Sequence, residues 1–247
     1  WEAALSNWDA GMDMYIYGKL GNLIMTKEGI NVLMTNLTGK VPPILQRLDY
    51  IRFNGEAAGY LHDLTLTGLF YTGAGMVKTD VMMSIDEQSM SRTYSGSVAS
   101  ADLDLGKLLN QEKKFGKVDF NVELKGFNYK NRYPESYIKG IISSFEYSQY
   151  QYENIMLDGV YKDGGFNGRL SMDDANGSVQ IDGNFNVAKT IPDFNLKASV
   201  KNLRPHDLHL SDKYENASIS LGLTADFTGK SIDDMNGRIS LDSLQLN

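Results

Sequence analysis

The sequence has 247 residues, of which 42% are hydrophobic and 22% are charged, a balance typical of folded rather than disordered chains. Its net charge of −7 provides no positive field for phosphate backbones and disfavours nucleic acid as a partner. It contains no cysteine, which excludes disulfides and thiolate metal sites, and no run of about 20 apolar residues that would cross a membrane.

Helices are expected to be few and short. The 24 glycines, 14 tyrosines and 10 phenylalanines beside only 5 prolines favour strands joined by tight turns. In chain order, the opening stretch from Trp1 to Trp8 is interpreted as a short helix. Residues 42–48, which begin Pro42-Pro43, have apolar residues at helical spacing, and residues 104–109 indicate one turn capped by Asp104.

The clearest strand is predicted over residues 118–125. Val118, Phe120, Val122 and Leu124 alternate there with four polar residues, so one face is apolar and the other polar. This pattern is typical of a half-buried antiparallel strand. The same alternation predicts strands over residues 179–187, 194–200 and 219–227.

Tight turns separate these strands. Asn176-Gly177 and Asn236-Gly237 are each predicted to form a two-residue hairpin tip in which both residues have positive φ. Further breaks are expected at residues 73–75, 163–165 and 228–229, and none is long enough to link two domains. We therefore expect residues 1–247 to form a single continuous β-segment.

Weak internal repeats support a sheet that grows by similar hairpins. Residues 63–70 match 154–161 at an offset of 91, Asp102-Leu103 matches Asn202-Leu203 at an offset of 100, and residues 173–182 match 233–242 at an offset of 60. These unequal offsets argue against a regular solenoid and suggest repeat units of about residues 50–150 and 150–247.

A search for catalytic or metal-binding patterns finds none that favours an enzyme. The histidines of His206-Asp207-Leu208-His209 lack the spacing of a zinc helix, and a solvated turn is the better interpretation. Residues 173–177 resemble a calcium loop only in part, because Met172 occupies the position of the first carboxylate ligand, so a hairpin turn is preferred. No catalytic residue, metal or cofactor is expected.

Tyrosines gather in the middle of the sequence and leave two interpretations open. They could form a platform on which sugars stack, or they could pair across strands, which we favour. The cluster consists of Tyr129, Tyr133, Tyr137, Tyr147, Tyr150, Tyr152 and Tyr161.

Several strings of turn and strand residues together resemble a known family. They are residues 64–68, 97–109, 145–159 and 231–237. They resemble the large AsmA-like proteins of the TamB type (translocation and assembly module), particularly the divergent forms of the Bacteroides group. The resemblance covers about residues 50 to 247. Because the chain starts at Trp1 and stops inside the alternating stretch 238–247, we expect an internal fragment of a longer parent.

The resemblance implies an all-β fold: an extended, twisted antiparallel sheet of repeated hairpins, curled like a taco into an open apolar groove. It implies a periplasmic location in a Gram-negative bacterium, with the full-length parent anchored in the inner membrane. The implied role is non-enzymatic, in phospholipid transport between the two membranes or in outer-membrane protein assembly. Phospholipid acyl chains, unfolded outer-membrane strands and an outer-membrane assembly protein are the implied partners.

The groove hypothesis assigns specific lining residues. The alternation in the two clearest strands predicts that their apolar faces line a common groove open to solvent or lipid. These residues are Val118, Phe120, Val122, Leu124, Ile219, Leu221, Leu223 and Phe227. The alternative is a closed β-sandwich that binds glycan or protein at a cell surface, and the two differ in whether the apolar face is sealed.

Overall fold

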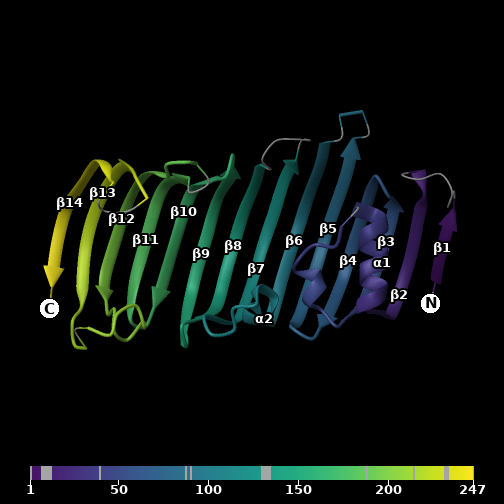
Figure 1. The fold of residues 1–247 in the computed structure, drawn as a ribbon, viewed down its shortest axis with the longest axis horizontal. Helices are drawn as coiled ribbons and strands as arrows, with labels where there is room; N and C mark the ends of the chain where they lie inside the picture. Colours follow the sequence, from purple (N-terminus) through teal and green to yellow (C-terminus); the bar gives the residue numbers. More distant parts are fainter. Residues whose placement is uncertain are drawn as a thin grey trace.

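The computed structural model shows an all-β chain built as one antiparallel sheet. It describes residues 2–6, 13–38, 40–86, 88–89, 91–128, 135–186, 189–213, 215–230 and 234–246. In this part of the chain every strand pairs with its sequence neighbours, so the sheet runs from β1 to β14 without a crossover and without closing on itself. Figure 1 shows the strands side by side along the long axis, with the two chain ends at opposite ends of the sheet.

Most strands are ten or more residues long. They are β1 (Glu2–Ser6), β2 (Tyr15–Thr26), β3 (Tyr50–Tyr60), β4 (Asp63–Thr72), β5 (Gly75–Asp86), β6 (Ser91–Asp104), β7 (Phe115–Asn128), β8 (Glu135–Tyr147), β9 (Tyr150–Lys162), β10 (Gly165–Asp174), β11 (Gly177–Asn186), β12 (Asp193–Leu203), β13 (Ile219–Thr228) and β14 (Asn236–Leu246). The four predicted strands correspond to β7, β11, β12 and β13, except that Val187 lies outside the described residues.

The helical predictions have mixed outcomes. Helix α2 (Leu105–Leu109) is confirmed, and the Asp104 side chain caps it by accepting from the Lys107 N–H at 2.9 Å. Residues 42–48 contain only a short 3₁₀ turn, η2 (Leu45–Arg47). The predicted opening helix is wrong, because residues 2–6 pair with β2 as strand β1. Helix α1 (Lys27–Thr38) is absent from the predictions.

The two predicted Asn-Gly hairpin tips are corrected. Asp174 pairs with Gly177, so the tip between β10 and β11 is Ala175-Asn176, and Asn176 does not have positive φ. In the second case Asn236 pairs with Thr228, so Asn236-Gly237 already belongs to β14. Two other tips have positive φ at both residues: Ser148-Gln149, with φ of 50° and 64°, and Asp163-Gly164, with φ of 51° and 77°.

Three segments outside the strands cover one side of the sheet, and each follows a bulge. In β2, β6 and β12 the register slips by one residue beside Asn22, Asp102 and Asn202, all of which have positive φ. The chain then leaves the sheet through α1, α2 and the turn at residues 205–209, respectively. The bulges therefore mark where the chain turns onto the face of the sheet.

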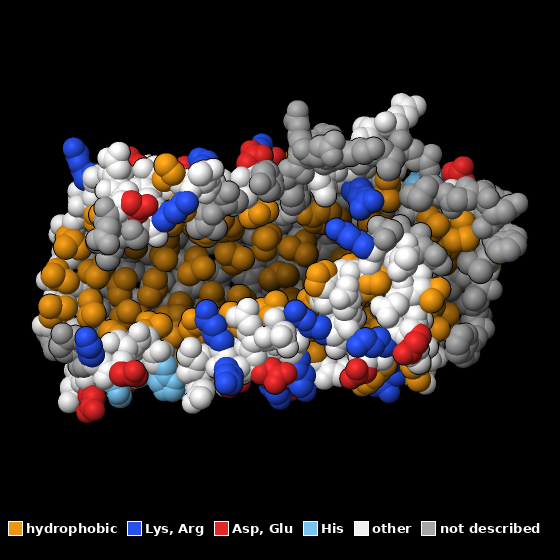
Figure 2. All heavy atoms as spheres, in the orientation of Figure 1, with side chains coloured by type: hydrophobic (Ala, Val, Ile, Leu, Met, Phe, Trp, Pro, Cys, Tyr) orange, Lys and Arg blue, Asp and Glu red, His pale blue; other side chains and the backbone are white. Residues whose placement is uncertain are grey.

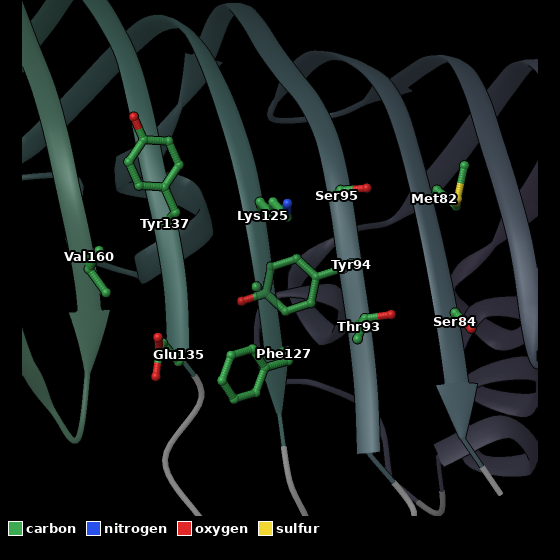
Figure 3. A pocket seen from close by; sticks show the side chains of 11 residues that line it. Met82, Ser84, Thr93, Tyr94, Ser95, Lys125, Phe127, Glu135, Tyr137 and Val160 are labelled. Carbon is green, nitrogen blue, oxygen red and sulfur yellow. The ribbon is translucent and has the colours of Figure 1, made fainter.

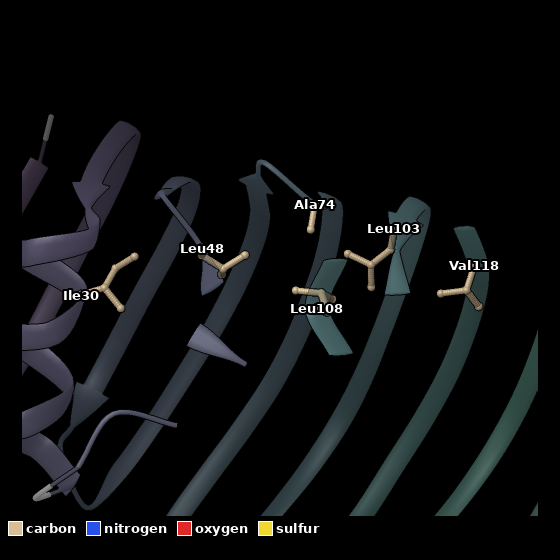
Figure 4. Packing of buried hydrophobic residues seen from close by; sticks show 6 residues of the cluster. All are labelled: Ile30, Leu48, Ala74, Leu103, Leu108 and Val118. Atoms are coloured by element: carbon tan, nitrogen blue, oxygen red, sulfur yellow. The ribbon is translucent and has the colours of Figure 1, made fainter. Parts of the chain in front are cut away.

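The closed core lies beneath α1 and α2, near one set of strand ends. Ile30 of α1 and Leu108 of α2 pack in one cluster with buried residues of the strands and of the η2 region. Figure 4 shows the six buried members, Ile30, Leu48, Ala74, Leu103, Leu108 and Val118. The rest of the sheet is a single layer, so its apolar face has no second layer from the described residues.

Candidate functional site

The apolar face of the sheet is the candidate site, and alternation within each strand creates it. On β7, Phe120, Val122 and Leu124 are half-buried, whereas the intervening Asn121 and Glu123 are exposed. Because successive side chains of a strand point to opposite faces, the half-buried residues share one face. We call this the inner face, since α1 and α2 pack on the same side as Val118.

The strand register joins these residues into apolar rows that run across the sheet. Residues directly opposite on neighbouring antiparallel strands lie side by side on the same face. One row is Phe120, Ile142, Ile155, Met172, Val179, Val200, Leu221 and Leu244. The next is Val122, Gly140, Leu157, Leu170, Ile181, Ala198, Leu223 and Leu241.

Aromatic side chains flank the aliphatic rows at both ends of the strands. Phe166 lies 5.8 Å from Phe185, and Phe194 lies 4.8 Å from Phe227, measured between ring centroids. Near the opposite strand ends a second aromatic group contains Phe145 and its neighbours. It consists of Phe115, Phe145, Tyr147, Tyr150 and Tyr152, with centroid distances between 4.8 and 6.5 Å.

The inner face is hollowed into a groove. Figure 2 shows hydrophobic side chains lining the hollow from the β14 end to the middle of the sheet, where atoms of the covering segments close over it. Glycines help the strands approach one another on this face: a Cβ added to Gly168 would collide with the Asp158 carbonyl, and one added to Gly183 with the Asn195 carbonyl. Both glycines have glycine or apolar partners across the strands.

The eight predicted lining residues all fall on β7 or β13, and the register relates them directly. Phe120 shares a row with Leu221, and Val122 shares a row with Leu223. Val118 differs from the others, because it is 6% exposed within the closed core, and Phe120 packs against that core. Ile219, Leu221, Leu223 and Phe227 are half-buried on β13, away from the core cluster.

The eight predicted lining residues include none from β9 to β12. The segments that cover part of the inner face are absent from that prediction as well. The alternation of residues 179–187 and 194–200 could have added Ile181 and Ala198. Helix α1 also carried a signal, because apolar residues recur at positions 30, 33 and 34 after a possible capping residue, Thr26. The Gly29 N–H lies 3.4 Å from Thr26 Oγ1.

Part of the tyrosine cluster fixes the turn at residues 205–209 to the sheet. Tyr152 donates a hydrogen bond to the Leu208 carbonyl at 2.7 Å, and burial raises the pKa of Tyr152. Tyr150 donates to Asp174 Oδ1 at 2.5 Å and accepts from Asn176 Nδ2 at 3.1 Å. Burial, followed by the bond to Asp174, raises the pKa of Tyr150 to about 12.

The structure divides the remaining tyrosines rather than uniting them. Tyr137 lies on the outer face, where it donates to Asp158 Oδ1 at 3.0 Å, and this bond raises the pKa of Tyr137. Tyr161 lies on the inner face, opposite Phe166. Tyr129 and Tyr133 lie outside the described residues. The described tyrosines therefore form no single stacking platform, and cross-strand pairing is confirmed for Tyr147 and Tyr150.

A second concavity lies on the outer face and is shown in Figure 3. It has a volume of about 410 Å³, and Phe127, Tyr137 and Met82 supply its apolar walls beside Lys125 and Glu135. It is broadly open, and a similar depression of about 480 Å³ adjoins it, sharing Met82, Lys125 and Tyr137. Its lining includes charged groups and comes from β5 to β9 alone, whereas the apolar rows of the inner face cross from β7 to β14.

His209 Nδ1 lies 2.9 Å from the Ser148 carbonyl and holds the turn at residues 205–209 against the β8–β9 hairpin. Among the described residues, no group of three or more histidine, aspartate or glutamate side chains is arranged to hold a metal ion. The helices in this part of the chain are too short or too polar to span a membrane.

Comparisons with known protein families, with curated proteins and with solved structures found no match.

Proposed function

We propose that this chain is a non-enzymatic groove segment that shelters the acyl chains of phospholipids. The observation that carries the proposal is the set of apolar rows that cross the sheet from β7 to β14, on a face over which the described residues place no second sheet. A large exposed apolar surface usually marks a binding site. The single unclosed sheet also disfavours the β-sandwich alternative, which needs a second sheet over this face.

The direction of the rows favours a lipid over an unfolded strand as the occupant. The aliphatic rows run perpendicular to the strands, along the long axis of the sheet, so a flexible chain lying in the groove would meet apolar side chains at every strand. An acyl chain is apolar along its whole length, whereas only every second side chain of an outer-membrane strand could enter the groove, and the polar backbone groups of that strand would lie against an apolar surface.

Binding of this kind needs no specific polar site. Each methylene removed from water contributes about 0.8 kcal/mol, so many similar contacts can hold an acyl chain while allowing it to slide. The proposed setting is the periplasm of a Gram-negative bacterium, within an inner-membrane-anchored parent of the TamB type that moves phospholipid between the membranes. Support for that setting is the resemblance of residues 50–247 together with the groove-shaped sheet.

The test compares two neighbouring residues of β13 on opposite faces. Leu223 lies in an inner apolar row between Ala198 and Leu241, whereas Thr224 is exposed on the outer face. Leu223→Asp places a carboxylate in the path of the acyl chain, where its desolvation is costly. We expect it to lower phospholipid binding at least tenfold, and Thr224→Asp to leave binding unchanged.

Native mass spectrometry of each variant mixed with phosphatidylethanolamine would measure the bound lipid, and thermal unfolding would show that both variants fold. A photo-crosslinker placed at residue 223 should yield lipid adducts, and one at residue 224 should not. Equal adducts at both positions, or wild-type binding by folded Leu223→Asp, would contradict the groove.

A further inference from the structure

One rim of the groove, at the strand ends next to α2, carries positive charge. Residues 105–117 contain four lysines and a single carboxylate, Glu112, although the whole chain has a net charge of −7. Two of these lysines form ion pairs with aspartates of β6. The other two, Lys113 and Lys114, are exposed and form no ion pair with a described residue. Their charge is therefore free to attract an anion.

Lys114 lies where the apolar groove meets water. Its Nζ is 5.6 Å from the ring centroid of Phe115 and 5.5 Å from that of Tyr147, two members of the inner-face aromatic group. No described lysine or arginine lies over the aromatic pairs at the opposite strand ends. Figure 2 shows Lys and Arg side chains along the lower rim of the hydrophobic hollow. Aromatic and lysine side chains meet in the same way at the surface of a membrane.

The β8–β9 hairpin tip fixes the backbone of this rim to the sheet. The Ser148 N–H donates to the Lys114 carbonyl at 2.8 Å, and His209 Nδ1 lies 2.9 Å from the Ser148 carbonyl. His209 also packs edge-on against Tyr150, with ring centroids 5.8 Å apart. The backbone at Lys114 is thus held in place while its side chain stays exposed, so the ammonium group keeps its position at the rim.

The aromatic group leads from Lys114 into the apolar rows. The rings of Phe115 and Phe145 lie 6.1 Å apart, measured between centroids. The next inner-face residue of β8 is Ile142, which pairs with Ile155 in one of the aliphatic rows. A flexible apolar chain that begins beside Lys114 can therefore pass over the rings and enter the row without leaving the apolar face.

We infer that Lys113 and Lys114 bind the phosphate of a phospholipid whose acyl chains occupy the groove, which rests on the proposed function. Desolvation of a charged phosphate inside the apolar rows would be costly, so the phosphate has to stay at a rim. The lysine ammonium group binds phosphate as a compact point charge. The rings beneath Lys114 would contact the first methylenes of the lipid. The site therefore takes a phosphate that is joined to an apolar chain.

Two lipids with the same acyl chains separate the phosphate from the groove. Dioleoyl phosphatidylglycerol carries a phosphate, and dioleoylglycerol carries none. In native mass spectrometry titrations, Lys113→Gln/Lys114→Gln should lower the affinity for phosphatidylglycerol about tenfold and leave the affinity for dioleoylglycerol unchanged. The matched control is Lys107→Gln/Lys117→Gln, which removes two charges of the same segment that are already paired, and it should leave both affinities unchanged. Thermal unfolding would show that both double variants fold.

Leu223→Asp distinguishes a failure of the phosphate site from a failure of the groove, because it should weaken binding of both lipids. If the wild type binds neither lipid, the groove and the phosphate site fall together. If the wild type binds both and the Lys113/Lys114 double variant binds both equally well, the groove stands and the phosphate site is overturned, as it is by an equal loss of both lipids in that variant. Glycerol 3-phosphate, which has no acyl chain, should bind far more weakly than phosphatidylglycerol, and equally tight binding would show that the site takes free phosphate esters rather than a lipid.

Discussion

Single residues with unusual backbone conformations determine where this sheet bends and where the chain leaves it. Asn22, Asp102 and Asn202 have φ between 48° and 72°, a region that asparagine and aspartate tolerate better than most residues. Each of them sits in a one-residue bulge. In two of the bulges a side chain of the neighbouring strand accepts a hydrogen bond from the backbone N–H of the bulged residue: Asp119 accepts from Asp102, and Ser220 accepts from Asn202. The local chemistry thus stabilises the bulge.

Tyr150 provides a pH-dependent test at the residue scale. Folding raises its pKa to about 12, above the value of about 10 for a free tyrosine. Its contribution to stability is therefore complete below pH of about 10 and is lost as the pH rises through about 12. Tyr150→Phe should lower the free energy of unfolding by about 1–3 kcal/mol at neutral pH, because the bonds to Asp174 and Asn176 disappear.

Denaturant unfolding at neutral and alkaline pH would measure this difference between wild type and Tyr150→Phe, and the ultraviolet absorbance of tyrosinate would follow the titration. The difference in stability should shrink as the pH passes about 10. A difference that stays constant up to pH about 12 would mean that the raised pKa has no structural consequence.

The element scale shows what the weak repeats mean. At the offset of 100 residues, Asp102 and Asn202 form equivalent bulges, each with two residues on one strand opposite one on the next. Leu108 and Leu208, at the same offset, are the buried leucines of the two segments that follow. The repeat therefore includes a bulge and a buried leucine that anchors the covering segment to the inner face.

Leu208 and Leu210 form a matched pair for testing this anchoring. Leu208 is fully buried, whereas Leu210 is 54% exposed in the same segment. Leu208→Ala should lower the free energy of unfolding by about 2–5 kcal/mol, because it leaves a cavity under the turn. Leu210→Ala should change it by less than about 0.5 kcal/mol. Chemical denaturation would compare the two, and equal effects would show that the turn is not anchored through Leu208.

Strands were predictable from this sequence where alternation is strict, and turns were not. In β7 every second residue is apolar from Val118 to Leu124, and the period of two identifies the strand directly. The Asn-Gly pairs were misplaced because turn preference is local, whereas the register of long strands depends on all their cross-strand pairs. The covering helices were harder still, since their burial depends on a sheet face that the local sequence does not reveal.

The same limit applies to the candidate groove. The alternation places Val118 and Leu124 on one face, but it cannot show that α2 covers the first and leaves the second open. The rows that join Val122 to Leu223 depend on five intervening strands in register. Such long-range pairing follows from the whole sheet rather than from either strand.

At the scale of the whole molecule, the outer face carries a row of charges that matches the apolar rows of the inner face. Opposite-charge residues lie directly across from one another on six successive strands. The row is Glu123, Lys139, Asp158, Arg169, Asp182 and Lys197. Two of its ion pairs are formed, Lys139–Asp158 at 3.6 Å and Arg169–Asp182 at 2.6 Å.

This alternation specifies register where the apolar face alone cannot. A slip of two residues keeps the apolar side chains on the inner face, so the hydrophobic pattern does not oppose it. The charges do oppose it. A two-residue slip of β8 against β7 brings Lys139 opposite Lys125 in one direction, and such a slip of β10 moves Arg169 away from Asp158 and Asp182. A sheet of similar hairpins therefore uses its solvent face to keep its groove continuous.

Arg169 offers the sharpest test, because it stands between Asp158 and Asp182. Arg169→Glu would place three acidic residues in succession across β9, β10 and β11. Each opposite-charge pair contributes about 0.2–1 kcal/mol, and like charges destabilise. The variant should therefore lose about 1–2 kcal/mol of unfolding free energy in low salt, and part of this loss should disappear in about 0.5 M NaCl, where the Debye length is only a few ångströms.

Arg169→Gln, which removes the charge without reversing it, should lose less unfolding free energy, and its loss should depend little on salt. Urea unfolding of both variants in low and high salt would decide the point: equal, salt-independent losses would show that Arg169 acts through packing alone and that the charged row does not help to set the register.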